Sequence, residues 1–250
     1  MGALPTFGSL VRTAWDSSRV RLRGLVLLSL LPLPPVLLLY LVAWRVPSAA
    51  GSLVLPIVTV VTLLVALVLS KVSAVGMLAY LADPRIQGGR MALRRGWQRF
   101  LPYLWTEILV AAIALVVMIP GLLLGGWLVT SNGATVATAA DAFLFLDVLL
   151  VVVVGCALLP GVLVAVRYAF APLAVAIGSP PGPAALALSS TLVAGHYWRI
   201  VGLLALWVVV QVAIVRMVSP LPIVNWLVPY LVGIVGVAYF VALFGALRKV

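Results

Sequence analysis

Four charged side chains lie inside long apolar runs of this sequence, and they are the residues best placed to do chemistry. They are Lys71, Glu107, Asp147 and Arg167. A charge at the centre of a bilayer costs at least about 2.5–3.5 kcal/mol on insertion scales, so it normally has a charged partner or a water-filled cavity. These residues therefore predict either an intramembrane polar site or the ends of membrane spans.

Lys71 and Arg167 occupy corresponding places, because each lies ten residues before the end of its apolar run. In one interpretation both lie near the midplane and pair with Glu107 or Asp147 in a transport or lipid-headgroup site. In the other, the helices continue below the cytoplasmic interface and both side chains extend their charged ends to the headgroups. Run lengths of 29 and 36 residues favour the second interpretation, since a bilayer needs about 20. Lys71 can pair with Glu107 in either case.

Enzyme motifs are missing from the sequence. The chain has one histidine, His196, and one cysteine, Cys156, so a His/Cys metal site is not expected. No G-x-S-x-G surrounds a serine, and there is no Walker A motif. An intramembrane hydrolase would need His196 beside a serine, but its neighbours Tyr197 and Trp198 are typical of a membrane interface. We expect no catalytic residue, no metal and no cofactor.

The composition indicates that lipid surrounds the chain. Of 250 residues, 65% are hydrophobic and 8% are charged, and mean hydropathy is +1.30, whereas a soluble domain has about a quarter of its residues charged. The net charge of +11 would suggest nucleic acid in a soluble protein, but no nucleic-acid-binding motif accompanies it. We therefore expect one integral membrane domain over residues 1–250 and no nucleic-acid partner.

The apolar runs predict an all-α fold, a polytopic transmembrane helical bundle. Six spans are expected, at residues 24–44, 53–81, 102–128, 142–177, 197–218 and 226–247. Amphipathic helices lying in the cytoplasmic interface are expected at residues 4–20, 88–100 and 183–195. Prolines at positions 32, 34 and 35 predict a kink or break in the first span.

The segment 83–104, called the arginine segment below, carries the highest density of charge. Its arginines are Arg85, Arg90, Arg94, Arg95 and Arg99. The cytoplasmic leaflet is rich in anionic lipid. These side chains are therefore the candidate contacts with anionic lipid or with a protein partner.

Basic residues also give the orientation. With the N-terminus inside, the arginine segment and the C-terminal pair Arg248 and Lys249 lie in the cytoplasm, and Arg45 and Arg216 fall outside. Because cytoplasmic loops of membrane proteins are enriched in Lys and Arg, we expect both termini in the cytoplasm. The expected location is a bacterial inner membrane.

The three interfacial helices resemble one another. Leu10–Trp15 aligns with Ala92–Trp97, and a weaker third copy contains Ala187 and Leu188. Each unit would be an interfacial helix followed by a hairpin of two spans. Repeated units usually pack their shared faces together, which predicts a compact six-helix bundle. Chance similarity among apolar segments is the alternative.

Three stretches carry a family resemblance. They are RYAFAPLAV at 167–175, GPAALALSS at 182–190 and GHYWRIVGL at 195–203. In this order they resemble a family of bacterial six-span membrane proteins related to the membrane domain of glycerophosphodiester phosphodiesterases. The resemblance implies architecture and assigns no chemistry to a residue. The phosphodiesterase barrel is absent, so that activity is not implied.

These observations favour a non-enzymatic inner-membrane protein, a scaffold or subunit of a membrane complex, with anionic lipid and a protein as partners. The alternative is the membrane component of a transporter or exporter that works with a separate ATPase. The prolines of the first span, together with Lys71 and Arg167, motivate that alternative. The intramembrane hydrolase is the least favoured interpretation.

Overall fold

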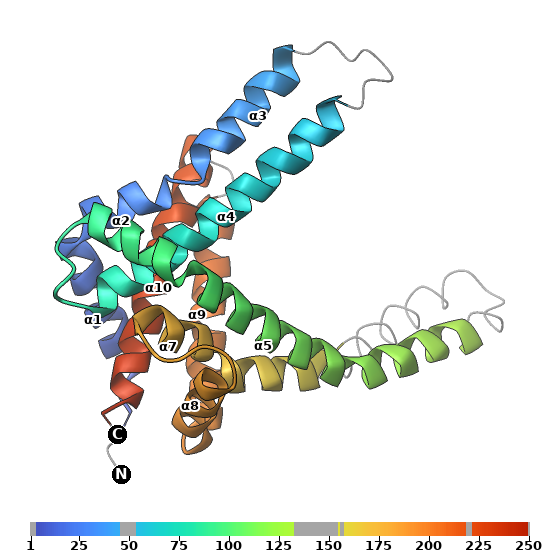
Figure 1. Ribbon diagram of the computed structural model, residues 1–250. Helices are drawn as coiled ribbons and strands as arrows, with labels where there is room; N and C mark the ends of the chain where they lie inside the picture. Colours follow the sequence, from blue (N-terminus) through green and yellow to red (C-terminus); the bar gives the residue numbers. More distant parts are fainter. Residues whose placement is uncertain (1–3, 46–53, 133–154, 156–157, 219–221, 250) are drawn as a thin grey trace.

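The computed structural model describes residues 4–45, 54–132, 155, 158–218 and 222–249. Within these ranges every regular element is a helix, which confirms the predicted all-α class (Figure 1). A helix satisfies its own backbone N–H and C=O groups, as an apolar segment away from water requires.

Nine helices are named along the described residues. In chain order they are α1 (Phe7–Val20), α2 (Leu22–Ser29), α3 (Leu33–Arg45), α4 (Val54–Ala82), α5 (Gly89–Asn132), α7 (Ala171–Ile177), α8 (Pro183–Ala194), α9 (Tyr197–Val218) and α10 (Pro222–Leu247). Residues 158–168 are also helical and lead through a turn into α7.

Several of these helices are long and apolar enough to cross a membrane. Among the described residues four qualify: Pro56–Ala82, Gly89–Leu124, Leu158–Ile177 and Tyr197–Val218. A fifth is obtained if the pair Phe7–Val20 and Leu22–Leu38, bent by 85°, counts as one span. The helices therefore support a membrane-embedded protein. The sixth predicted span falls in α10, whose apolar stretch Leu231–Leu247 is shorter, so the number six stays a prediction.

The first predicted span is broken where its prolines begin, as the sequence predicts. Pro32 lies in the turn between α2 and α3. Because it has no N–H, it cannot donate to the carbonyl of Leu28 four residues earlier. The Leu28 carbonyl accepts instead from the N–H of Leu31 at 3.2 Å and from the hydroxyl of Ser73 in α4 at 2.5 Å. The neighbouring helix thus supplies the hydrogen bond that the proline removes.

The structure differs from the prediction at the arginine segment. The sequence predicts an interfacial helix at 88–100 and a separate span at 102–128, but one helix, α5, runs through both. Pro102 and Pro120 lie inside it. No glycine or turn residue ends the helix between the two predicted pieces, and apolar helices tolerate proline where neighbours satisfy the backbone.

The first part of the predicted fourth span lies outside the described residues. Asp147 and Cys156 are among the residues that the structure does not describe.

The helices diverge from a common base rather than forming the predicted compact bundle. In Figure 1, α3 and α4 extend together in one direction and α5 extends in another. None of the most apolar stretch of α5 is buried inside the protein, and only 17% of that of α4 is. A bundle would require α4 and α5 to pack along their length. Instead their apolar faces point outward, which suits a lipid surround.

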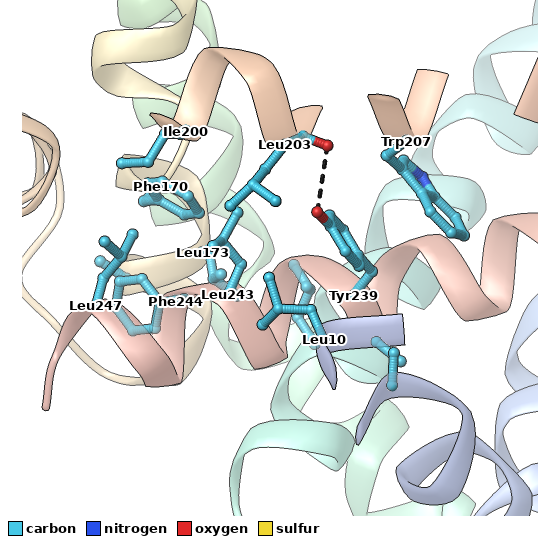
Figure 2. Packing of buried hydrophobic residues seen from close by; sticks show 14 of the residues in the cluster. Leu10, Phe170, Leu173, Ile200, Leu203, Trp207, Tyr239, Leu243, Phe244 and Leu247 are labelled. Carbon is cyan, nitrogen blue, oxygen red and sulfur yellow. Dashed lines mark hydrogen bonds between the residues drawn. The ribbon is translucent and has the colours of Figure 1, made fainter. Parts of the chain in front are cut away.

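The hydrophobic core lies in the base, where α1, α9 and α10 meet the start of α7 (Figure 2). Phe170 and Ile200 are fully buried there. Tyr239 stacks on Trp207 with ring centroids 4.9 Å apart and donates its hydroxyl to the carbonyl of Leu203 at 3.2 Å. This packing joins α9 to α10.

Helices α4 and α5 cross in backbone contact at two glycines. A Cβ on Gly96 would overlap the carbonyl oxygen of Val72 and would lie 3.0 Å from the backbone nitrogen of Gly76. Small residues permit such an approach between apolar helices. The crossing sets the first turns of α5, which carry the arginines, against α4.

Candidate functional site

Lys71 and Glu107 form an ion pair between α4 and α5. The Lys71 Nζ lies 2.5 Å from the Glu107 Oε1, and the two side chains are 30% and 35% exposed. This pairing was open in both interpretations of the sequence, and the structure confirms it. Opposite charges joined in this way lower the cost of placing each in an apolar surround.

Arg167 does not join this pair. It is exposed on the helical residues 158–168, and its guanidinium carbon lies 6.0 Å from the centroid of the Tyr168 ring. It lines a separate pocket with Ser190 and Tyr197, whose hydroxyl donates to the carbonyl of Leu163 at 2.9 Å. Among the described residues the ion pair therefore consists of Lys71 and Glu107, and Arg167 lies elsewhere.

Glu107 also lines an open cavity of about 420 Å³ whose walls come from α4, α5, α7, α9 and α10. Its second oxygen, Oε2, is buried and receives no hydrogen bond from a described residue. Tyr103, Trp207 and Gln211 are the other polar or aromatic side chains that line it and can hydrogen-bond. A volume of this size matches small-molecule sites, which run about 300–1,000 Å³.

Glycines on α10 leave room for this cavity. Gly233 and Gly236 both line it. A Cβ on Gly236 would lie 3.3 Å from both the Gln211 Nε2 and the Trp207 Nε1. A side chain at position 236 would therefore occupy part of the cavity.

Three of the five arginines of the arginine segment are exposed. Arg85 lies in the turn before α5, and Arg90 and Arg94 are exposed on the first turns of α5, whereas Arg95 and Arg99 are half-buried. None of the five forms an ion pair with a carboxylate in the part of the chain that the structure describes.

A groove of about 600 Å³ lies beside these arginines, between α4 and the first turns of α5. It is called the arginine groove below, and its lining is almost entirely apolar apart from two arginines and a glutamine. The lining residues are Leu31, Leu69, Val72, Arg90, Leu93, Arg94, Trp97 and Gln98.

The hydrolase alternative requires the His196 ring beside a serine. The nearby serines are engaged elsewhere: Ser189 donates to the carbonyl of Arg167 and Ser190 to that of Ala187, each at 2.9 Å. No hydrogen bond joins His196 to a serine among the described residues, and these residues contain no cluster of three or more metal-ligating side chains.

Sequence reasoning found Glu107, Arg90 and Arg94 but missed the other residues that line the cavity at Glu107 and the arginine groove. Gln211 could have been found, because it is the one amide in the apolar run of α9. The arginine groove could not, since it depends on the crossing at Gly76 and Gly96 and on Leu31 in the break between α2 and α3.

No family model, curated protein or solved structure matches the chain. The resemblance to the six-span family therefore stays a prediction from the sequence. The case for function depends on the site geometry.

Proposed function

We propose that this is a non-enzymatic, multi-pass membrane protein that serves as a scaffold or subunit of a membrane complex. In this proposal the arginine segment contacts anionic headgroups of the cytoplasmic leaflet, and a protein partner docks on the same side. The observation that carries it is that Arg85, Arg90 and Arg94 are exposed and form no ion pair with a carboxylate among the described residues.

The charge balance of the chain supports this proposal. The sequence has 16 Lys and Arg against 5 Asp and Glu, and Glu107 is already paired with Lys71. The chain therefore has few carboxylates with which to neutralise its own arginines. Each Lys or Arg near an anionic membrane surface contributes about 1 kcal/mol of attraction, so five together give a strong preference for anionic lipid.

The proposal includes the predicted topology of six spans with both termini in the cytoplasm of a bacterial inner membrane. The long apolar helices support it, with α10 as the sixth span. The positive-inside rule then places the arginine end of α5 in the cytoplasm.

A lipid competition experiment tests this function. The protein is reconstituted in vesicles of phosphatidylcholine and phosphatidylglycerol, one of them brominated, and tryptophan quenching reports their relative binding. We expect the wild type to prefer phosphatidylglycerol. The variant Arg90→Gln/Arg94→Gln/Arg95→Gln/Arg99→Gln should lose most of that preference. An unchanged preference, with unchanged co-purification of protein partners, would rule the proposal out.

The cavity at Glu107 favours a second candidate, the membrane component of a transporter. A solid bundle in this region would have argued against transport, whereas Glu107, Gln211 and Trp207 line an open space. A buried carboxylate oxygen with no hydrogen bond from the described residues is an acceptor for a cation or another donor. In this candidate a separate ATPase would drive the movement.

Water access distinguishes this candidate from a dry structural cavity. In a Cys156→Ser background, Tyr103→Cys should react with a small water-soluble thiol reagent if the cavity is hydrated. Leu115→Cys, on the exposed apolar part of α5, is the lipid-facing control and should not react. If Tyr103→Cys reacts no more than Leu115→Cys, the cavity is dry and the transport candidate is ruled out.

A further inference from the structure

The arginine groove combines two features that rarely occur together. Its walls are apolar, formed by Leu31 from the α2–α3 break, Leu69 from α4 and Leu93 from α5. Its rim carries Arg90 and Arg94, both exposed and neither in an ion pair within the described residues. An occupant that satisfies both features must be apolar over most of its length and negatively charged at one end.

The two arginines are spaced to share one anion. Residues at i and i+4 of a helix lie on the same face with Cβ atoms about 5–6 Å apart, so Arg90 and Arg94 point from successive turns of α5. Arginine presents a planar fork of donors that matches the oxygens of a phosphate, and such charge-assisted hydrogen bonds are stronger than neutral ones.

Trp97 lies one turn further along the same wall. It is 60% exposed, and it stacks on Phe100 with ring centroids 6.3 Å apart. Tryptophan concentrates at headgroup level, where its ring touches the acyl region and its N–H faces polar groups. The groove thus has acyl-compatible walls, an interfacial aromatic residue and a cationic rim in one place.

We propose that the arginine groove is a binding site for one anionic glycerophospholipid. Its phosphate lies between Arg90 and Arg94, and an acyl chain follows the wall of Leu93, Leu69 and Leu31. The site rests on the proposed function, and it deepens that function by giving one specific lipid position within the arginine segment.

Charge complementarity selects the lipid over a second copy of this chain. A second copy would bring 5 Asp and Glu against 16 Lys and Arg, so it has little negative charge to place between two arginines. A phospholipid carries the anion and the apolar tail in one molecule and is present at high concentration in the membrane.

Binding of phosphatidylglycerol, measured by native mass spectrometry of the detergent-solubilised protein, tests the site with charge-matched variants. Arg90→Gln/Arg94→Gln removes the two rim arginines. Arg85→Gln/Arg95→Gln removes the same charge from the same segment, but neither residue lines the groove. We expect the first variant to weaken binding by about tenfold or more, the loss expected for charge-assisted hydrogen bonds, and the second to weaken it much less.

A second test, independent of the arginine variants, fills the groove with a larger side chain. Leu69→Trp places a large ring in the groove, whereas Leu67→Trp changes an exposed residue of α4 that does not line it. Leu69→Trp should displace the lipid and Leu67→Trp should not. Arg90→Lys/Arg94→Lys, which keeps the charge, should recover part of the affinity.

The outcomes separate this inference from the proposed function. Equal losses in the two arginine pairs would mean that the segment attracts lipid diffusely, which overturns the groove and leaves the function standing. No loss in either pair would overturn both. Equal loss of phosphatidylcholine and phosphatidylglycerol in Arg90→Gln/Arg94→Gln would also overturn the groove.

Discussion

At the scale of single residues, the ion pair of Lys71 and Glu107 is the polar link between the two longest helices. Its charges lie where the surround is apolar, so each depends on the other. The other carboxylate oxygen of Glu107, Oε2, is buried and receives no hydrogen bond from the described residues. The pair therefore stabilises the crossing of α4 and α5 while leaving an acceptor beside the cavity.

Removing one member of this pair should destabilise the protein more than removing both. Leaving a charge uncompensated costs up to about 3–5 kcal/mol where a pair is fully buried, and less here because the side chains are 30% and 35% exposed. Lys71→Met and Glu107→Gln should each lower the thermal midpoint in detergent. The double variant should recover part of the loss. Strictly additive losses would show that the two side chains are not coupled.

At the scale of helices, the contact between α4 and α5 determines where the arginines lie. Gly76 and Gly96 let the two backbones touch, and the hydrogen bond from Ser73 to the Leu28 carbonyl ties the broken first span to the same place. The arginine groove lies beside this contact, with walls from α4 and from the first turns of α5.

Substituting Gly96 should therefore damage the fold although alanine is the better helix former. Its Cβ would meet the backbone of α4, which cannot rotate away, and overpacking of this kind costs about 1–3 kcal/mol. Gly96→Ala should lower the thermal midpoint. Gly202→Ala in α9, where a Cβ meets nothing within 4 Å, should leave it equal or higher. A Gly96→Ala protein as stable as the wild type would contradict the crossing.

At the scale of the whole molecule, the long and exposed apolar helices support a membrane-embedded protein. The long helices present little buried surface to one another, so lipid or a partner must cover them. The base formed by α1, α7 and α8 with the ends of α9 and α10 holds the diverging helices together.

The proposed topology can be checked by labelling from each side of the membrane. In a Cys156→Ser background, Arg85→Cys and Gly8→Cys should react with an impermeant thiol reagent from the cytoplasmic side. Thr135→Cys, in the predicted external loop, should react from the outside. Labelling of all three from one side would contradict the predicted spans.

Much of the helical architecture could be predicted from the sequence, because apolar runs and proline positions are local signals. Helix α9 has the predicted bounds 197–218, α8 begins at the predicted Pro183, and the first span breaks at Pro32. The continuity of α5 through Pro102 was missed, since proline weakens a helix without always ending it. The divergence of the helices was missed because it depends on contacts between segments far apart in sequence.

The candidate site was predictable only in part. The arginines and the pairing of Lys71 with Glu107 followed from charge in an apolar context. The arginine groove depends on which residues of α4 face α5, and no local pattern specifies that. Six spans, the repeat and the identity of the partners remain proposals.

The most direct measurement is the composition of lipids that co-purify with the protein in mild detergent. The wild type should retain anionic phospholipid above its share of the membrane, and Arg90→Gln/Arg94→Gln/Arg95→Gln/Arg99→Gln should retain lipid in the proportions of the membrane. Retention of lipids in bulk proportions by both proteins would contradict the central claim that the arginine segment contacts anionic lipid.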